Sequence, residues 1–264
     1  MVRVVTHGGP GERGSVLARS LWYAAELLVT LGLVLLLLVV HQLWWTNRQA
    51  RAGAQAAVQR LEEEWGHRAV PDAVPDALPD AVADASPDAV PDTSPDTAPK
   101  AVPGTAPVVP PPSRPHAAYA ILRIPRLGLS APVAEGIGKR AVLNKGYVGH
   151  YPRTAQPGRA GNFALAGHRN THGEPFRHLD RLRAGDRITV ETRAAVHTYA
   201  VVGAPARTTP YDSGVLKAVP RSDVRPGQGF REPGYYLTLT TCTPVHTSKY
   251  RLVVWGKLRS TVPR

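Results

Sequence analysis

A long apolar run near the N-terminus sets the first limit on how this chain can fold. It extends from Leu21 to Trp45, and its one acidic residue, Glu26, lies near its start. A helix of about 20 apolar residues is long enough to cross the hydrocarbon core of a bilayer. Aromatic pairs lie near both ends, Trp22-Tyr23 and Trp44-Trp45, as is typical of the membrane–water interface. Because no other segment is hydrophobic enough to bury such a helix in a soluble core, the sequence predicts a membrane span over residues 21–45.

This span has the features of an uncleaved signal anchor. The apolar run is longer than that of a usual signal peptide, and no small-residue cleavage site follows it before Trp44. The flanking charge does not fix its orientation, because three arginines precede the run and three follow it within a short distance. A short N-terminal part before a long C-terminal part is the usual layout when the long part is translocated. We therefore expect a cytoplasmic tail over residues 1–20 and the bulk of the chain outside the cell.

Residues 46–115 are expected to separate the span from a folded domain. The segment 49–65 is rich in Ala, Gln, Glu and Leu, which favours a juxtamembrane helix. From Asp72 to Asp96 an aspartate recurs at every fourth position, mostly within Pro-Asp-Ala-Val or a near copy, and Pro-rich sequence continues to Pro115. Regular proline excludes helix, and the lack of aromatic residues leaves no core to bury, so we expect a disordered linker. Fully extended, it would reach on the order of 100 Å between the bilayer and the folded domain.

Charge divides the chain at Pro115. Residues 1–114 contain 9 Lys+Arg and 12 Asp+Glu, whereas residues 115–264 contain 23 and 8. So basic a domain indicates polyanionic surroundings. The sequence contains no nucleic-acid recognition motif, no metal finger and no aromatic-basic stacking surface, and a membrane anchor argues against DNA. We expect no nucleic acid partner, and an anionic cell envelope explains the charge equally well.

Residues 116–264 are numerous enough for one domain core. Short apolar or alternating runs separated by Gly and Pro dominate this part, and only 174–182 has a helical pattern, with Phe176, Leu179 and Leu182 on one face. The pattern predicts a mostly β domain, either a barrel or a sandwich. The predicted strands are Ala120–Ile124, Leu129–Val133, Asn162–Ala166, Arg187–Thr192, His197–Gly203, Tyr235–Thr241 and Arg251–Leu258.

Cys242 is the only cysteine, so it can form neither an internal disulfide nor a thiolate zinc cage. A single cysteine is often an inert core residue, but a nucleophilic one needs a nearby base or cation. His168 follows a strand-like run and a glycine, at a strand-to-loop edge where sites are often built. Arg251 begins the next run after Cys242. If these two runs are antiparallel neighbours, the eight-residue connection returns the guanidinium to the thiol's end of the sheet.

At these residues the chain resembles the sortases, which are membrane-anchored cysteine transpeptidases of Gram-positive bacteria. The segment from Thr238 to Cys242 is similar to the TLxTC signature, Arg251 falls where the family's arginine falls, and Ala166-Gly167-His168 matches the strand-end histidine. The resemblance spans roughly Ile121 to Leu258 and is greatest to class E, the actinobacterial housekeeping type. The wider patterns that carry it are Gly149-His150-Tyr151-Pro152, Gly161-Asn162-Phe163, Gly167-His168-Arg169 and Cys242-Thr243-Pro244.

The resemblance implies a sortase catalytic domain over residues 116–264, an eight-stranded β-barrel with short helices. We expect no cofactor and no metal-ligating residues in its site. It implies that Cys242 attacks the threonine carbonyl of an LAxTG-like sorting signal, and that a peptidoglycan precursor amine resolves the thioester. By the same resemblance His168 is the general acid/base, Arg251 positions the substrate and stabilises the oxyanion, and Thr241 lines the pocket. The implied partners are sorting-signal proteins, the peptidoglycan precursor amine and the membrane.

Two other functions remain as alternatives, and the first of them uses the same trio of residues. A membrane-tethered cysteine peptidase would resolve the thioester with water instead of an amine. A non-catalytic, sortase-like barrel would hold envelope polymers by its positive charge, although the complete trio of Cys, His and Arg argues against this.

The remaining histidines are interpreted without a metal. His172 and His178 follow His168 closely, but the Gly and Pro between them disrupt a shared helical face, and no acidic residue has ligand spacing. We interpret His150 and His246 as polar loop residues beside the cleft. The long connection 208–232 is expected to form a wall of the binding site.

Overall fold

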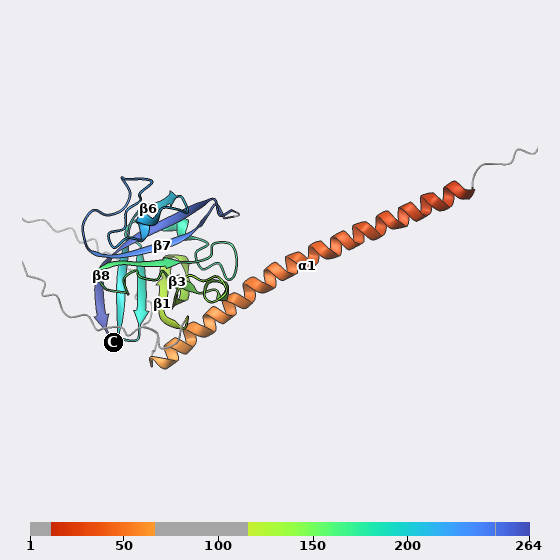
Figure 1. The fold of residues 1–264 in the computed structure, drawn as a ribbon. Coiled ribbons are helices and arrows are strands. Elements are labelled where there is room, and N and C mark those ends of the chain that lie inside the picture. The colour runs from red at the N-terminus through yellow and green to blue at the C-terminus, as the bar shows by residue number, and fades with distance from the viewer. Residues whose placement is uncertain (1–11, 67–115, 246) are drawn as a thin grey trace, which may run out of the picture.

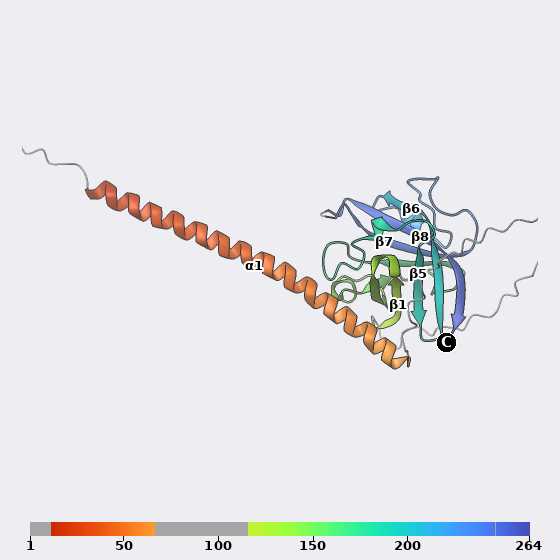
Figure 2. The same ribbon diagram turned by 180° about the vertical axis from the view of Figure 1, so that it is seen from behind.

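Eight strands close into a single barrel in the computed structural model, which describes residues 12–66, 116–245 and 247–264. The order around the barrel is β1-β2-β3-β4-β7-β8-β6-β5 (Figures 1 and 2). The expected mostly β fold is confirmed, and it is a barrel and not a sandwich. The strands are β1 (Ala118–Ile124), β2 (Leu129–Glu135), β3 (Val148–His150), β4 (Gly161–Ala166), β5 (Arg187–Thr192), β6 (Ala195–Thr208), β7 (Tyr235–Thr243) and β8 (Tyr250–Pro263).

Two of the strand pairs are parallel, β2 with β3 and β4 with β7, and the other pairs are antiparallel. A parallel pair needs a long crossover connection, and residues 136–147 provide one between β2 and β3. The β4–β7 pairing places the carboxyl ends of both strands at the same end of the barrel, where β8 begins. We call this end the site end.

The pattern of the sequence predicted seven of the eight strands. It missed β3, which has three residues with Gly149 at its centre, too few to show an alternation. The predicted helix over 174–182 is wrong, because Glu174 has a φ of +54° and the segment contains only a 3-10 turn, η3 (Leu179–Arg181). Phe176, Leu179 and Leu182 are nevertheless buried in the core, as their spacing predicted.

One long helix, α1 (Glu12–Glu64), precedes the barrel and contains both the apolar run and the juxtamembrane segment. It is long and apolar enough to cross a membrane: its most hydrophobic 18-residue window has a mean hydropathy of 2.5, and none of this window is buried. The His41 ring stacks on Trp45 with centroids 6.2 Å apart, and the Arg48 guanidinium lies 4.8 Å above the Trp44 ring. These contacts suit the end of a span, where aromatic and basic side chains meet the interface.

The C-terminal part of α1 packs against the barrel. Ala50 approaches Gly146 so closely that a Cβ on this glycine would lie 2.7 Å from the Ala50 carbonyl oxygen. Farther along the helix, Val58 and Leu61 form a buried cluster with Ile121 of β1. Small side chains on one face of α1 thus allow close approach, and aliphatic ones on the same face bury apolar area.

Polar contacts fix both ends of this packed segment. At its far end Glu62 forms an ion pair with Arg123, and the Arg264 guanidinium lies 5.3 Å above the Trp65 ring. At its near end the Asn47 amide donates to the Glu174 carboxylate at 2.9 Å, and Oδ1 of Asn47 accepts the Gly173 N–H at 2.8 Å.

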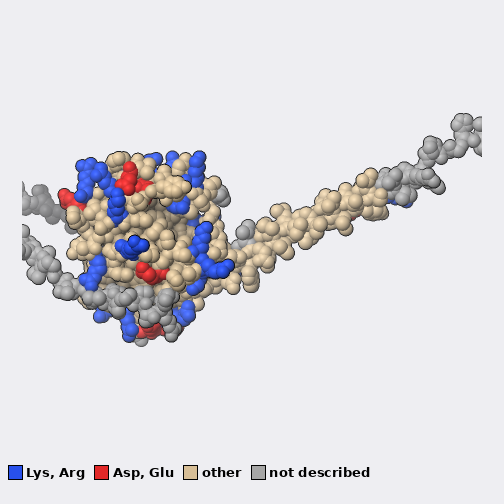
Figure 3. Space-filling view, viewed as in Figure 1, with Lys and Arg blue, Asp and Glu red and all other residues tan. Residues whose placement is uncertain are grey.

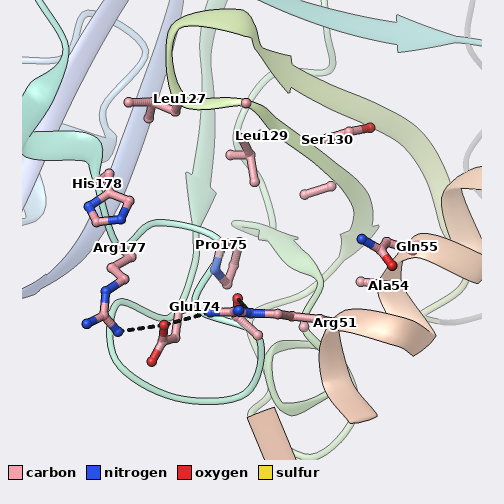
Figure 4. A pocket seen from close by; sticks show the side chains of 14 residues that line it. Arg51, Ala54, Gln55, Leu127, Leu129, Ser130, Glu174, Pro175, Arg177 and His178 are labelled. Carbon is pink, nitrogen blue, oxygen red and sulfur yellow. Dashed lines mark hydrogen bonds and ion pairs between the residues drawn. The ribbon is translucent and has the colours of Figure 1, made fainter. Parts of the chain in front are cut away.

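The Glu174 carboxylate lies between two arginines (Figure 4). Arg51 of α1 is 2.9 Å from it and Arg177 is 2.6 Å from it. Next to this triad, α1, the turn after β1 and the loop after β4 enclose a pocket of about 340 Å³. His172, Gly173 and Glu174 all have positive φ, +50°, +84° and +54°. Such a conformation costs non-glycine residues roughly 1 kcal/mol each, so the contacts from α1 stabilise a strained loop.

The position of α1 changes one expectation. Residues 67–115 lie outside the described residues, so their disorder stays a prediction. However, α1 from Asn47 onward and Trp65, which directly follows it, contact the barrel and its loops, and the packed helix therefore sets the distance between span and barrel. The expectation that the linker separates the bilayer from the folded domain by up to about 100 Å is therefore wrong for this arrangement.

Substitution of Leu61 by Asp is expected to detach this part of α1 from the barrel. It would place a charge against Ile121, at a cost of at least about 3 kcal/mol from lost burial and an unpaired carboxylate. Hydrogen exchange of the full chain should show residues 47–64 losing protection. Gln59→Asp adds the same charge at an exposed position of the helix and should leave protection unchanged. Equal protection in both variants would contradict a packed helix.

Candidate active site

The strand register brings His168, Cys242 and Arg251 to the site end. In the antiparallel pair β7–β8, Cys242 is directly opposite Arg251. In the parallel pair β4–β7, Ala166 is opposite Thr240, so two more residues along each chain put His168 level with Cys242. The three residues therefore form one row across three neighbouring chain segments, as the sequence suggested for Cys242 and Arg251.

The backbone just before His168 is fastened to β7. The Gly167 N–H donates to the Thr240 carbonyl at 3.2 Å, and the buried Thr241 hydroxyl donates to the Gly167 carbonyl at 2.7 Å. A Cβ on Gly167 would lie 2.7 Å from the Phe176 ring, so only glycine fits here. Thr241 thus links the two segments that carry His168 and Cys242. Its contact with substrate stays a prediction.

His168 is partly buried and hydrogen-bonded through one ring nitrogen. Its Nε2 lies 3.0 Å from Oδ1 of Asn144, and because an amide oxygen only accepts, Nε2 carries the hydrogen and Nδ1 is free to act as a base. The His172 ring stacks on it, with centroids 5.4 Å apart. Burial, and then the positive charges of His172 and Lys139, lower the pKa of His168 from 6.5 to about 4. The imidazole is therefore neutral at pH 7.

Cys242 is partly exposed, although the six residues before it in β7 are buried. This exposure argues against an inert core cysteine. Arg251 is also partly exposed, and its guanidinium donates to the carbonyls of Ser248 and Tyr250 at 3.1 and 3.2 Å. Ser248 lies in the β7–β8 connection and Tyr250 is the first residue of β8, so the guanidinium lies against the start of β8.

Arg169 and Asn144 belong to the site although the sequence did not single them out for it. Arg169 is buried, donates to the Thr243 hydroxyl at 2.7 Å and forms an ion pair with Asp180 at 3.2 Å. It thus fixes the end of β7 next to Cys242. The only sequence signal for Arg169 was its position directly after His168. Asn144 gave no signal, because it lies in the 3-10 turn η2 (Leu143–Lys145), 24 residues before His168 and outside every motif.

The expectation that His150 is a polar loop residue is wrong, because it is a buried residue of β3. Its Nδ1 lies 2.7 Å from a Glu135 carboxylate oxygen and 2.9 Å from the Tyr119 hydroxyl, because a buried imidazole needs polar partners. His246 falls outside the described residues. Within the described ranges, His168, His172 and His178 are not part of any group of three or more side chains arranged to hold a metal ion.

The connection 208–232 is organised around a buried carboxylate that the sequence did not reveal. Asp212 accepts hydrogen bonds from the hydroxyls of Thr208 and Ser222 and from the Asp223 N–H. Burial alone would raise the pKa of Asp212, but the bonds from Ser222 and Thr208 lower it. The short 3-10 turn η4 (Ser213–Leu216) follows directly. This connection is therefore preordered, which suits a wall of a binding site.

The domain is expected to lose stability as the pH falls from about 6.5 to about 4. Burial lowers the pKa of His197 to about 4, as it does mainly for His168. In the unfolded chain these two histidines become protonated below their usual pKa of 6.5. In the folded chain they stay neutral until the pH falls to about 4. Their contribution is therefore fully present above about pH 6.5 and is lost below it. Thermal unfolding of the wild-type protein should show a midpoint temperature that falls between about pH 8 and pH 5, where carboxylates stay ionised. In His168→Gln the midpoint should change less with pH, because one of the two histidines is gone. A constant midpoint would contradict both shifts.

Comparisons with known proteins cover the whole candidate site. The family model described as the sortase domain matches residues 122–259. Sortase SrtE1 of Streptomyces coelicolor is 39% identical over 246 residues, which are 90% of this chain but only 57% of that protein. Sortase SrtE2 of the same organism is 31% identical over 258 residues, 95% of this chain and 87% of that protein. The crystal structure of sortase E1 from Streptomyces coelicolor, with a tripeptide in its active site, has a TM-score of 0.53 and 48% identity, and covers 57% of this chain and 93% of that chain.

Proposed function

The chain belongs to the sortase family, and from that premise we propose that it is a membrane-anchored cysteine transpeptidase with Cys242 as its nucleophile. We assign residues 1–20 to a cytoplasmic tail, 21–45 to the span, 46–115 to the juxtamembrane helix and linker, and 116–264 to the extracellular catalytic domain. The similarity to class E sortases supports the proposal that the chain is a transpeptidase of this class.

The observation that carries this proposal is the strand register at the site end. Cys242 is partly exposed after six buried residues of β7, and Arg251 is opposite it in β8. His168 follows two residues after Ala166, which pairs with Thr240 of β7. A thiol, an imidazole and a guanidinium on adjacent segments are the groups that acyl transfer needs: a nucleophile, a proton carrier and an oxyanion donor.

In the first half of the reaction the Cys242 thiol gives its proton to the neutral imidazole of His168. The sulfur then attacks the carbonyl carbon of the threonine in an LAxTG-like signal. When the C–N bond breaks, the leaving amine takes the proton from the imidazolium, and a thioester remains on Cys242. The lowered pKa of His168 keeps the imidazolium a minority species at pH 7 and makes it a strong acid for this step.

In the second half an amine attacks the thioester. It loses a proton to His168, the C–S bond breaks, and the thiolate is protonated as the cycle closes. We propose a peptidoglycan precursor as the amine, because the domain faces the cell envelope in the proposed topology. Arg251 donates to the oxyanion in both halves, exchanging the carbonyls of Ser248 and Tyr250 for substrate oxygens. Thr241 and the connection 208–232 line the binding site.

The test is acyl transfer by the full chain in detergent or nanodiscs. An LAxTG-type peptide is incubated with and without an amine acceptor, and the products are followed by mass spectrometry. Amine-dependent ligation supports the transpeptidase. Hydrolysis at a rate that the acceptor does not change would indicate a peptidase, and the absence of any cleavage would indicate a binding module. Residues 47–65 must be retained, because α1 is packed against the barrel.

A further inference from the structure

Three segments meet where α1 leaves the barrel, and we call their surface the span-side face. They are residues 46–54 of α1, the crossover 136–147 and the loop 167–178. Asn47 of α1 contacts the loop 167–178 at Gly173 and Glu174, and Ala50 contacts the crossover at Gly146. Figures 1 and 2 show α1 leaving the barrel beside the loops that precede β3 and follow β4. The site end and the span therefore lie on the same side of the barrel.

The depth of this face follows from helix geometry. Asn47 is two residues beyond Trp45, and Arg51 is six residues beyond it, which at about 1.5 Å per residue is roughly 3 and 9 Å along the axis. The headgroup layer on each side of a bilayer is about 5 to 8 Å thick. If the hydrocarbon core ends near Trp45, the loop contacted by Asn47 lies at headgroup depth. Tilting the helix would bring the face closer to the membrane.

The exposed charges of the face have one sign. Figure 3 shows Lys and Arg side chains at the edge of the barrel beside α1. The one acidic residue of the three segments, Glu174, is buried and paired with Arg51 and Arg177, which stay about half exposed. By contrast, the other end of α1 carries three consecutive glutamates, 62–64. The exposed cations of the face are Arg48, Arg51, Lys139, Arg140, Lys145 and Arg177.

The crossover 136–147 supplies three cations that have no carboxylate partner among the described residues. They are Lys139, Arg140 and Lys145, and all three are exposed. Ile137, in the same crossover, exposes 38% of its surface. Unpaired cations beside an exposed aliphatic side chain, adjoining a span, complement a layer of anionic headgroups above hydrocarbon.

We propose that the span-side face binds anionic phospholipid headgroups of the bilayer that α1 crosses, so that the barrel lies with its site end against the membrane. This rests on the membrane span of the proposed function and adds a lipid partner to it. The site would then take its substrates at the membrane surface and not at the end of a long tether.

Hydrogen exchange of the full chain in nanodiscs tests this inference. One set of discs contains phosphatidylcholine alone, and the other contains phosphatidylcholine mixed with phosphatidylglycerol. We expect residues 136–147 to exchange roughly tenfold more slowly in the anionic discs at low salt, and the difference to vanish at high salt. The comparison needs no variant, so it does not depend on the folding of a mutant.

A pair of charge-matched variants assigns the effect to the face. Lys139→Gln/Arg140→Gln/Lys145→Gln should abolish the lipid-dependent slowing. Arg193→Gln/Lys257→Gln/Arg259→Gln removes three exposed cations outside the face and should preserve it. Equal loss in the two variants would indicate a response to net charge and would overturn the assignment.

Three further results would overturn the proposal. Equal exchange in both kinds of disc, with α1 inserted, would show that anionic lipid is not the partner while leaving the transpeptidase intact. Protection by added poly(glycerol phosphate) but not by phosphatidylglycerol would assign the face to a wall polymer. Failure of the chain to insert, scored by co-elution with the discs, would remove the membrane span from the proposed function as well.

Discussion

Replacing Cys242 by alanine in the full chain is expected to abolish ligation and cleavage of the sorting peptide, with a loss of at least about ten-thousandfold in kcat/KM. Cys242 is the only cysteine in the sequence, so no second thiol can replace it. The imidazole of His168 would have no proton to accept and no thioester would form. Steady-state kinetics with mass-spectrometric detection measures the loss directly.

The thioester itself provides an independent readout. Wild-type protein mixed with peptide in the absence of an amine should show a mass increase equal to the acylated fragment, and hydroxylamine should remove it. Cys242→Ala should show no adduct at unchanged thermal stability, because the side chain lies at a partly exposed strand end. A variant that retains the adduct or the ligation would place the nucleophile elsewhere.

Replacing His168 by alanine is expected to lower kcat by about a thousandfold, because both half-reactions require a proton carrier at this position. The wild-type rate should fall only as the pH drops towards about 4, since the neutral imidazole starts the reaction and its pKa is lowered to about 4. A structural role alone would not produce this acid limb. The measurement is kcat/KM between about pH 4 and pH 8, provided that the barrel is folded throughout.

His172 offers the matched control for this prediction. Its ring stacks on His168 and its charge helps to depress the pKa of His168. His172→Gln should keep most of the activity but move the acid limb to higher pH. If His168→Ala retained a tenth or more of the rate, or if His172→Gln lost as much as His168→Ala, the assigned roles would be wrong.

The sequence predicted those parts of the fold that repeat with a short period. The alternating residues of β5 are alternately buried and partly exposed in the barrel, and the apolar run of β7 is a continuously buried strand. Residues near the strand ends, such as Ala166 and Cys242, then locate the site. Sequence could not place Asn144 against His168, because a single polar residue in a turn has no periodic signal. The same holds for Asp212, whose hydroxyl and N–H partners are spread over a long connection.

The packing of α1 was also out of reach of sequence reasoning. Helical propensity and the alanines of residues 49–65 predicted the helix, but not what it contacts. Asn47 and Glu174 are 127 residues apart and meet through a loop with three consecutive positive φ angles. Only Gly173 among these three residues gave any hint of that conformation. Such contacts depend on the complete barrel, not on any local pattern.

The two ends of the segment between Gly66 and His116 are both attached to the barrel, since α1 is packed on β1 and the chain re-enters at β1. In the proposed topology, a protease that cut the backbone between these two ends would therefore not release the domain into the medium at once. The nicked halves would stay together through the cluster of Val58, Leu61 and Ile121 and the charged contacts at either end of the helix. Shedding from the cell surface would then be governed by the dissociation rate of this contact and not by the cleavage itself.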